Sequence, residues 1–375
     1  MKRILDFLKK DPMLWVAVLA AIVSFFITPP SLATLKNIDW KTLATLFMLL
    51  LILDGFKSEN LFLPVIRLTC RFKTRLALTL FLVFGVFFSS MFVTNDVSLI
   101  IFVPLTIILF RASGKERALV PVIVLENIAA IRGSLLTPFG SPQNLFLFSK
   151  SDLTAGEFIM MMLPLWLMSI ILIIIFAVMF QVKNPGERLE LPENVSGVWL
   201  RENRPRRIVY TVLFTAVIVT IVTRTSLWPL AALGVAAVLL IFDRRVFLRV
   251  DYALLGTFLC FFIFSSSITG NEALSEFLSD AVAGHEYAWS IGLSQLISNV
   301  PAAIVLYPFS TDIKPLIYGL DTAGLVDIIG SLASVICLRI YNREYPGEGG
   351  RFILVFEIIS LAFFAVVAPL QLLLL

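Results

Sequence analysis

The sequence predicts an all-α polytopic membrane protein built from two inverted repeats, and three observations predict it. Of its 375 residues, 59% are hydrophobic and only 15% are charged, whereas a soluble domain is about 45–50% apolar. The apolar residues form runs that are long enough to cross a bilayer as helices, which takes about 17–25 residues. Motifs of the first half recur in the same order in the second half. We therefore expect lipid to be the solvent for most of this chain.

Nine apolar segments are candidate full spans. They are 12–28, 40–56, 118–148, 156–181, 207–223, 227–242, 252–268, 314–341 and 351–374. Two further apolar pairs, 76–111 and 286–309, are interrupted by the polar steps Thr94-Asn95-Asp96 and Ser298-Asn299. These interruptions predict a helical hairpin in each pair. The first span could also be a signal peptide, but the missing polar spacer favours an anchored helix.

The lysines and arginines predict how the chain is oriented. Six segments hold 24 of the 30, and each holds at least three: 1–11, 54–75, 111–117, 182–207, 243–249 and 339–351. Because cytoplasmic loops carry an excess of Lys and Arg, we expect these segments inside. The expected location is the inner (plasma) membrane, with a cytoplasmic N-terminus and an outside C-terminus. This rule does not distinguish a re-entrant hairpin from two full crossings.

Internal similarity predicts the division into repeats. Three pairs of segments align in order: Ile38–Thr45 with Val250–Thr257, Thr94-Asn95 with Ser298-Asn299, and Gly140-Ser141 with Gly330-Ser331. We count an odd number of net crossings between the copies, so the second copy enters the membrane in the opposite sense. We expect a first repeat at 1–181, a cytoplasmic linker at 182–206 and a second repeat at 207–375. Each repeat would hold one hairpin and one broken helix, 118–148 in the first and 314–341 in the second.

Polar residues at the two hairpin tips are candidate binding groups. Thr94, Asn95 and Asp96 interrupt the first hairpin, and Ser298 and Asn299 interrupt the second. Unwound backbone at membrane depth is tolerated only where it is buried in protein or lines a cavity. An Asn side chain there can offer its carbonyl to a cation or its NH₂ group to an anion. Asp96 could bind a cation or carry a proton. The alternative is that these residues cap helices in short external turns.

A second group of polar residues surrounds the two helix breaks. The stretch 126–144 contains two Gly and two Pro residues together with Arg132, and a spanning helix should break there. Its partner stretch, 319–331, contains Asp321 and Thr322 but no proline. Broken helix ends present partial charges to a ligand. Arg132 could hold an anion through two parallel hydrogen bonds, or it could form an internal salt bridge with Asp96, Glu126 or Asp321.

At these motifs the chain resembles the ion transporter superfamily, which includes arsenite permeases, related sodium–proton antiporters, citrate transporters and divalent anion–sodium symporters. The resemblance covers nearly the whole chain and rests on four motifs: Thr94-Asn95, Ser298-Asn299, Thr137-Pro138-Phe139-Gly140-Ser141-Pro142-Gln143-Asn144 and Gly330-Ser331-Leu332-Ala333-Ser334. It implies a re-entrant hairpin and a broken helix in each repeat. It also implies an elevator-type transport domain and a homodimer. Arg132 departs from the family pattern, because small residues are usual there.

The motifs and the resemblance together give two candidate sets of residues. The expected substrate-binding set is Thr94, Asn95, Arg132, Ser141, Asn144, Ser298, Asn299 and Thr322. The expected ion-coupling set, for Na⁺ or H⁺, is Asp96, Asn127, Gly133, Ser134, Asp321 and Gly324. We expect no other cofactor and no metal site, because the three cysteines form no close pair and His285 has no Cys or His neighbours.

These features favour a secondary active transporter of a small anion, either a carboxylate or an inorganic oxyanion. We expect its transport to be coupled to an ion gradient. An arsenite or oxyacid efflux permease and a sodium–proton antiporter are alternatives from the same superfamily. An ion channel is the alternative from another class, although no filter motif is present. We do not expect an enzyme; an Asp96–Asp321 dyad would be the one protease-like arrangement. The expected partners are the anion, a coupling cation, membrane lipid and a second copy of the chain, but no nucleic acid.

Overall fold

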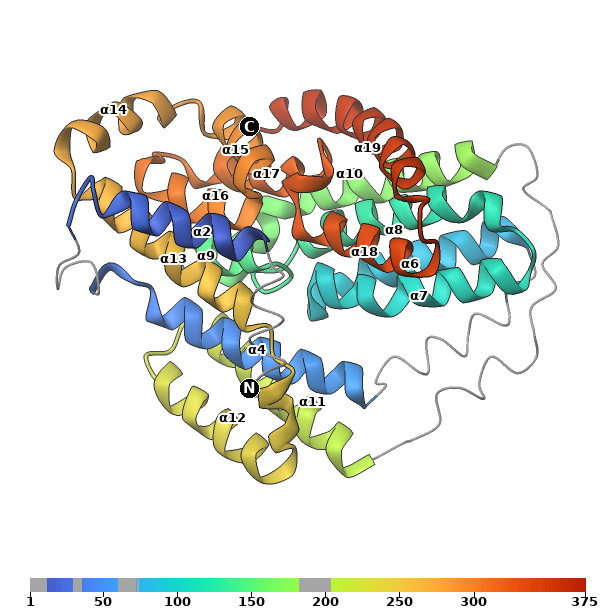
Figure 1. The fold of residues 1–375 in the computed structure, drawn as a ribbon, viewed down its shortest axis with the longest axis horizontal. Helices are drawn as coiled ribbons and strands as arrows, with labels where there is room; N and C mark the ends of the chain where they lie inside the picture. The colour runs from blue at the N-terminus through green and yellow to red at the C-terminus, as the bar shows by residue number, and fades with distance from the viewer. Residues whose placement is uncertain (1–11, 30–35, 60–71, 73, 182–203) are drawn as a thin grey trace. The chain divides into compact units, whose positions relative to one another are not determined.

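The computed structural model describes residues 12–29, 36–59, 72, 74–181 and 204–375, and every regular element in them is a helix (Figure 1). The expected linker at 182–206 lies almost entirely outside the described residues. The chain divides into two compact units. The first unit comprises Met1–Ser58, Leu145–Asp152 and Asn203–Leu320, and the second unit comprises Glu59–Asn144, Leu153–Glu202 and Asp321–Leu375. Each unit therefore takes segments from both halves of the sequence, and the predicted repeats stay a prediction.

The second unit is organised around one buried helix. Its helices are α6 (Arg75–Val93), α7 (Asn95–Ala112), α8 (Leu119–Ser134), α10 (Ala155–Gln181), α18 (Leu332–Glu344) and α19 (Gly349–Leu372). The other five all pack against α8, and every residue of α8 except Pro121 is buried. A helix buried on all sides is normally hydrophobic all round. Because α8 also carries Glu126, Asn127 and Arg132, these polar groups must find their partners inside the protein.

The first unit consists of two helix groups. Its helices are α2 (Pro12–Ser24), α4 (Trp40–Ser58), α11 (Arg204–Val222), α12 (Trp228–Phe242), α13 (Tyr252–Thr269), α14 (Glu272–Val282), α15 (Glu286–Ile297) and α16 (Asn299–Leu306). Helix α4 packs against α11 and α12, whereas α13 packs against α2 and α16 (Figure 1). Near the end of α4, Arg249 forms ion pairs with Asp54 and Asp243. Two of the boundaries between the units fall inside helices, namely α9 (Pro142–Lys150) and α17 (Ile313–Ala323).

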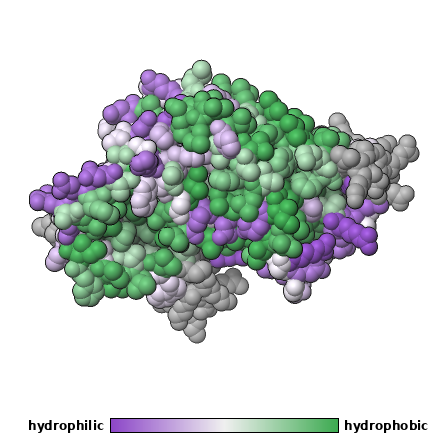
Figure 2. Space-filling view, turned by 90° about the horizontal axis from the view of Figure 1, so that it is seen from above, coloured by the Kyte–Doolittle hydropathy of each residue, from purple (hydrophilic) through white to green (hydrophobic). Residues whose placement is uncertain are grey.

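Lipid-facing side chains explain the composition. Large hydrophobic residues stand exposed on long helices, for example Met160 at 66% and Ile171 at 60% exposure, both on α10 (Ala155–Gln181). Figure 2 shows hydrophobic residues over much of the visible surface. Six helices of the described residues are long and apolar enough to cross a membrane, namely α6, α7, α10, α11, α13 and α19. Helix α4 has the length but carries three charged residues, and α12 has 15 residues. The chain is thus a polytopic helical membrane protein, and the number of nine spans stays a prediction.

Both hairpins turn on a single residue with the same unusual backbone. Thr94 separates α6 from α7 with φ 70° and ψ 155°, and Ser298 separates α15 from α16 with φ 68° and ψ 157°. Such angles belong almost exclusively to glycine, and a side chain there costs about 1–3 kcal/mol. The interruptions lie where the sequence predicts them. Helices α6 and α7 have 19 and 18 residues, enough for a crossing, whereas α15 and α16 have 12 and 8.

The helices also break within the two windows that the sequence indicates. Helix α8 ends at Ser134, and α9 begins at Pro142. Helix α17 ends at Ala323, and α18 begins at Leu332. The second break lacks proline, and there the Asp327 side chain accepts a hydrogen bond from the Ile329 N–H and caps a short 3₁₀ turn. The second break thus contains a polar cap, whereas the first break contains prolines.

The close approach of α6 and α8 requires Gly133. A Cβ atom at this position would lie 2.0 Å from the Phe87 carbonyl oxygen, so the two helices would have to separate. We expect Gly133→Ala to destabilise the protein by about 1–3 kcal/mol, the usual cost of overpacking. Thermal unfolding of the detergent-purified protein measures the effect. Gly156→Ala in α10 is the matched control, because nothing lies within 4 Å of its Cβ position. Equal melting temperatures for both variants would contradict the tight contact.

Candidate functional site

The first hairpin tip meets the first helix break inside the second unit. The Asn95 backbone N–H donates a hydrogen bond to the Gly140 carbonyl oxygen at 3.3 Å. The Asn95 side-chain oxygen accepts from the Asp96 N–H at 2.9 Å, and Asn95 is 5% exposed. Asn95 is therefore buried in protein, which is the condition for irregular backbone at membrane depth, whereas Thr94 and Asp96 on either side of it are half-buried.

Arg132 is fully buried near the end of α8. Its Nε donates to the Ser169 hydroxyl of α10 at 2.9 Å. Its Nη1 donates to the Thr322 hydroxyl at 3.2 Å. Thr322 in turn exchanges hydrogen bonds with Gln371 at 2.7–2.8 Å. The Ser169 and Thr322 hydroxyls therefore fix the orientation of the guanidinium group.

Asp321 carries the buried carboxyl group that interacts electrostatically with Arg132. Its two oxygens accept hydrogen bonds from Gln143 at 3.0 Å and from Asn144 at 3.2 Å, both at the start of α9. Asp321 is 2% exposed. The sequence alternatives for Arg132 therefore both stay predictions. Arg132 interacts electrostatically with Asp321, and it donates hydrogen bonds to the Ser169 and Thr322 hydroxyls.

Glu126 forms a second buried polar group on α8. It is 0% exposed, and one carboxylate oxygen accepts from the Thr106 hydroxyl of α7 at 2.5 Å. Its other oxygen, Oε2, has no hydrogen-bond partner among the described residues. The neighbouring Asn127 donates to the Ser334 hydroxyl of α18 at 3.0 Å. An ionised carboxylate with an unused oxygen in such surroundings is costly, so this position can accept a proton or an oxygen-coordinated cation such as Na⁺.

The second hairpin tip belongs to the first unit. Asn299 is 2% exposed, and its side-chain NH₂ donates to the Leu320 carbonyl oxygen at 3.4 Å. The buried Ser298 hydroxyl has no partner in the part of the chain that the structure describes. The other twelve candidate residues all belong to the second unit. A single site that combines both tips therefore stays a prediction.

Several candidate residues shape the helix ends. The Ser141 hydroxyl accepts from the Asn144 N–H at 3.3 Å and so caps α9. The Ser134 hydroxyl donates to the Ile131 carbonyl oxygen of its own helix at 3.1 Å. A Cβ atom at Gly324 would lie 2.6 Å from the Ser331 side chain, which shows how closely the second break is packed. These residues hold the breaks in place.

Several side chains that contact the candidate residues lie outside both predicted sets. They are Gln143, Ser169, Ser334, Cys337 and Gln371. Thr106 contacts Glu126, which the sequence suggested only as an ion-pair partner of Arg132. Ser169 and Gln371 had a usable signal, since each is a lone polar residue in a long apolar run. Thr106 had none, because a Thr hydroxyl inside a helix can bond to its own backbone.

Comparison with known proteins identifies the family of this chain. The family model described as "Citrate transporter" matches residues 7–337. The chain is 34% identical to the "Inner membrane protein YbiR" of Escherichia coli (strain K12), over 85% of each chain. It is 30% identical to the "Uncharacterized transporter MJ0456" of Methanocaldococcus jannaschii, over 86% of each chain. The family is one of membrane transporters and not of enzymes, and it fits the ion transporter superfamily that the motifs resemble. The chain belongs to the citrate transporter family.

Proposed function

We propose that this protein is a secondary active transporter of a small anion, a carboxylate or an inorganic oxyanion. The observation that carries the proposal is the fully buried Arg132, which the Ser169 and Thr322 hydroxyls orient beside a helix break. Charges attract each other strongly where water is excluded. An anionic substrate would bind to this guanidinium group through charge-assisted hydrogen bonds. Thr94, Asn95, Ser141, Asn144, Ser298, Asn299 and Thr322 complete the proposed substrate-binding set.

A carboxylate is the substrate that we favour. The guanidinium group presents parallel N–H donors that match the two oxygens of a carboxylate. The family description, "Citrate transporter", points to the same chemistry. Sulfate and phosphate share the charge, and they are the natural competitors in a substrate screen.

Glu126 is our leading candidate for ion coupling. A buried carboxylate with one unused oxygen gains most from a bound cation. A proton or Na⁺ taken up there would travel with the anion. The predicted coupling residues Asp96, Asn127, Gly133, Ser134, Asp321 and Gly324 lie in the same unit.

The similar backbone angles at Thr94 and Ser298 support two repeats, and the odd number of expected crossings between them supports their inversion. We infer on this basis a transporter with one hairpin and one broken helix per repeat, about nine spans, a cytoplasmic N-terminus and an outside C-terminus. Elevator-type movement and a homodimer are what the superfamily resemblance adds. Cross-linking and accessibility labelling of single cysteines would test these features.

A sodium–proton antiporter is the second candidate. Two buried carboxylates, Glu126 and Asp321, favour it, because such groups can exchange H⁺ for Na⁺. In that mechanism the acids are essential and no organic anion is carried. Reconstituted vesicles separate the two functions: anion uptake that saturates supports the anion transporter, and Na⁺-dependent proton flux without an anion supports the antiporter.

Replacing Arg132 should abolish anion transport. We expect Arg132→Gln to lower the uptake rate by on the order of 10–100-fold, because a hydrogen bond to a charged group contributes about 1.5–3 kcal/mol. Arg132→Lys should recover part of it. Uptake of labelled citrate, sulfate and phosphate into proteoliposomes measures the rate. Arg111→Gln is the control, since this exposed arginine pairs with Glu344 outside the core. Wild-type uptake in Arg132→Gln would remove the residue from the substrate site.

The two hairpin tips should contribute equally to ligand binding. We expect Asn95→Ala and Asn299→Ala each to lose binding while the protein stays folded, because each amide lies at the start of a hairpin helix. A thermal-shift screen of each variant against carboxylates, sulfate, phosphate, arsenite and Na⁺ reports binding. Size-exclusion chromatography reports folding. An effect at only one tip would show that the paired site is wrong.

Glu126→Gln should uncouple transport. Glutamine keeps the oxygen that accepts from Thr106 but carries no titratable proton. Under an imposed gradient of about one pH unit, we expect accumulation to fall by roughly tenfold, because one proton moving down such a gradient releases about 1.4 kcal/mol. Anion exchange at equal concentrations should persist. Uptake with and without an imposed pH or Na⁺ gradient checks this. Glu116→Gln, at an exposed position bonded to Tyr345, is the control. Unchanged gradient dependence in Glu126→Gln would assign coupling elsewhere.

A further inference from the structure

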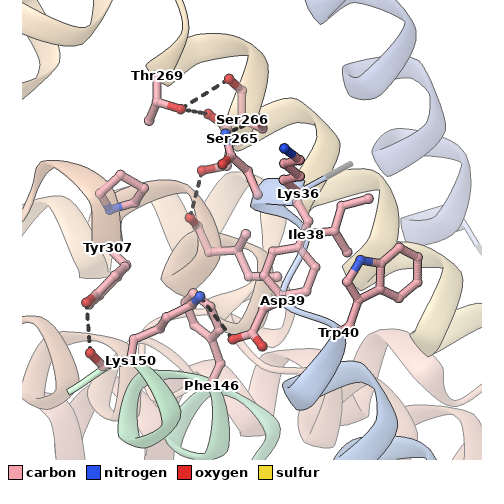
Figure 3. Close-up of a pocket in the computed structure, with 14 residues that line it drawn as sticks. Lys36, Ile38, Asp39, Trp40, Phe146, Lys150, Ser265, Ser266, Thr269 and Tyr307 are labelled. Carbon is pink, nitrogen blue, oxygen red and sulfur yellow. Dashed lines mark hydrogen bonds and ion pairs between the residues drawn. The ribbon is translucent and has the colours of Figure 1, made fainter. Parts of the chain in front are cut away.

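The first unit contains a pocket that neither candidate set includes. Its volume is about 510 Å³, within the range of small-molecule sites. Its polar lining comes from the chain before α4, the end of α9, helix α13 and the turn after α16 (Figure 3). The polar side chains that matter here are Lys36, Asp39, Lys150, Ser266 and Tyr307. All of them belong to the first unit.

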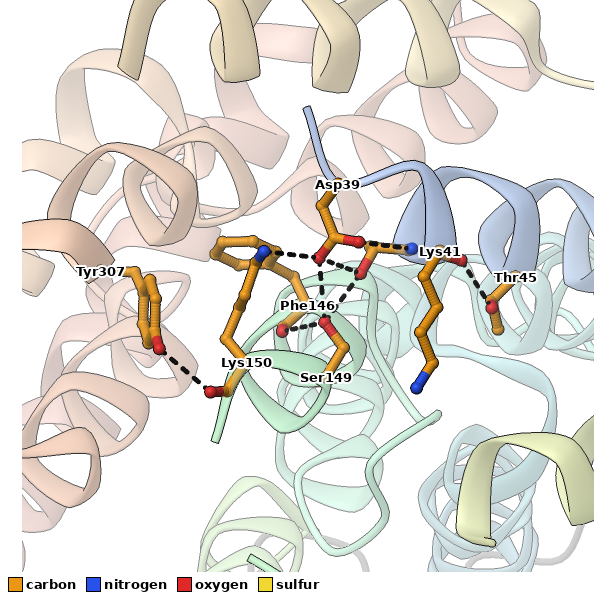
Figure 4. A network of polar contacts seen from close by, with 8 residues as sticks. Asp39, Lys41, Thr45, Phe146, Ser149, Lys150 and Tyr307 are labelled. Carbon is orange, nitrogen blue, oxygen red and sulfur yellow. Dashed lines mark hydrogen bonds and ion pairs between the residues drawn. The ribbon is translucent and has the colours of Figure 1, made fainter. Parts of the chain in front are cut away.

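The acidic group of this pocket, the Asp39 carboxylate, already has hydrogen-bond donors and an ion-pair partner (Figure 4). Asp39 accepts hydrogen bonds from the backbone N–H and the hydroxyl of Thr42 at 3.0 and 2.9 Å. The Ser149 hydroxyl donates to it at 3.2 Å. The Lys150 ammonium group pairs with it, also at 3.2 Å. The Asp39 side chain is 9% exposed, so this carboxylate holds the wall of the pocket together and is not open to a cation.

The pocket keeps one positive charge in excess. Lys150 balances Asp39, whereas Lys36 makes no ion pair within the described residues. An ammonium group has three N–H donors, and Lys150 remains 34% exposed. The Ser266 oxygen accepts from the Asn37 amide at 3.0 Å, so its own O–H group can donate to a ligand. Charge and hydrogen-bond donors therefore both suit an anion.

We propose that this pocket binds a small anion bearing a carboxylate or phosphate group, held by Lys36, Lys150 and Ser266. The site is separate from Arg132 and does not depend on the proposed transport function. A dissolved anion or the headgroup of an anionic lipid offers the same chemistry. The lipid source has to be tested because Trp40, which lines the pocket, is 51% exposed and Trp favours the membrane interface.

Amine-reactive labelling read by mass spectrometry resolves the site. The full-length protein is placed in phosphatidylcholine nanodiscs and labelled with and without citrate or inorganic phosphate. We expect the added anion to slow labelling of Lys36 and Lys150 by about tenfold, since a bound charge-assisted contact of about 1.4 kcal/mol or more corresponds to that factor. Lys41 is the internal control, because it follows Trp40 on α4 and does not line the pocket. Equal protection of all three lysines, or of none in any lipid, would overturn the proposal.

Matched variants test the same contact. Lys36→Gln removes no contact found among the described residues, so the fold should persist, and we expect it to lower citrate or phosphate protection of Lys150 about tenfold. Lys41→Gln makes the same change of charge outside the pocket and should leave protection unchanged. Full protection of Lys150 in Lys36→Gln would overturn the proposal. Arg132→Gln should also leave the protection of Lys150 unchanged. Failure of the transport proposal and failure of this proposal are therefore distinguishable.

A second lipid composition identifies the source of the anion. In nanodiscs that contain phosphatidylglycerol, protection of Lys36 without any added anion would assign the pocket to a lipid headgroup. Protection that requires citrate or phosphate in both lipids would assign it to a dissolved anion. Both results support an anion site. Labelling of Lys36 that neither lipid nor dissolved anion slows refutes it.

Discussion

The cost of placing polar groups inside a buried membrane helix is the constraint on which the second unit depends. Helix α8 is enclosed by five other helices, so water cannot satisfy its side chains. Each polar group on it instead reaches a different neighbour: Arg132 reaches Ser169 of α10, Glu126 reaches Thr106 of α7, and Asn127 reaches Ser334 of α18. These contacts fix the register of helices whose apolar faces would otherwise slide past one another.

The hairpin tips follow from the same constraint. A reversal between two helices leaves backbone groups without helical partners, and inside protein they need substitutes. The N–H of Asn95 finds the Gly140 carbonyl oxygen at the neighbouring helix break. The strain at Thr94 is tolerated because packing around the tip over-determines its conformation. Two local irregularities thus stabilise each other, and the backbone angles of Ser298 show the same turn in the other hairpin.

Local features of the sequence predicted much of this arrangement. The apolar runs indicated helices, and the Gly and Pro residues at 133–142 indicated the first break, because those residues act on their own backbone. Contacts between distant residues could not be predicted. Nothing near Asp321 indicates that Gln143 bonds to it across 178 positions, and the pocket at Lys36 forms only when four separate segments meet. The two compact units also cut across the sequence halves, because packing follows space and not chain order.

The spacing of charges along α8 carries one further consequence for the proposed function. Glu126 and Arg132 stand six residues apart, about 9 Å along the helix axis, in surroundings that screen charge poorly. An ionised Glu126 would reduce the attraction of Arg132 for an anion, and a proton or Na⁺ at Glu126 would restore it. The cation and the anion would therefore strengthen each other's binding, and such linkage is reciprocal. An arrangement of this kind favours movement of both ions in the same direction over exchange of one for the other.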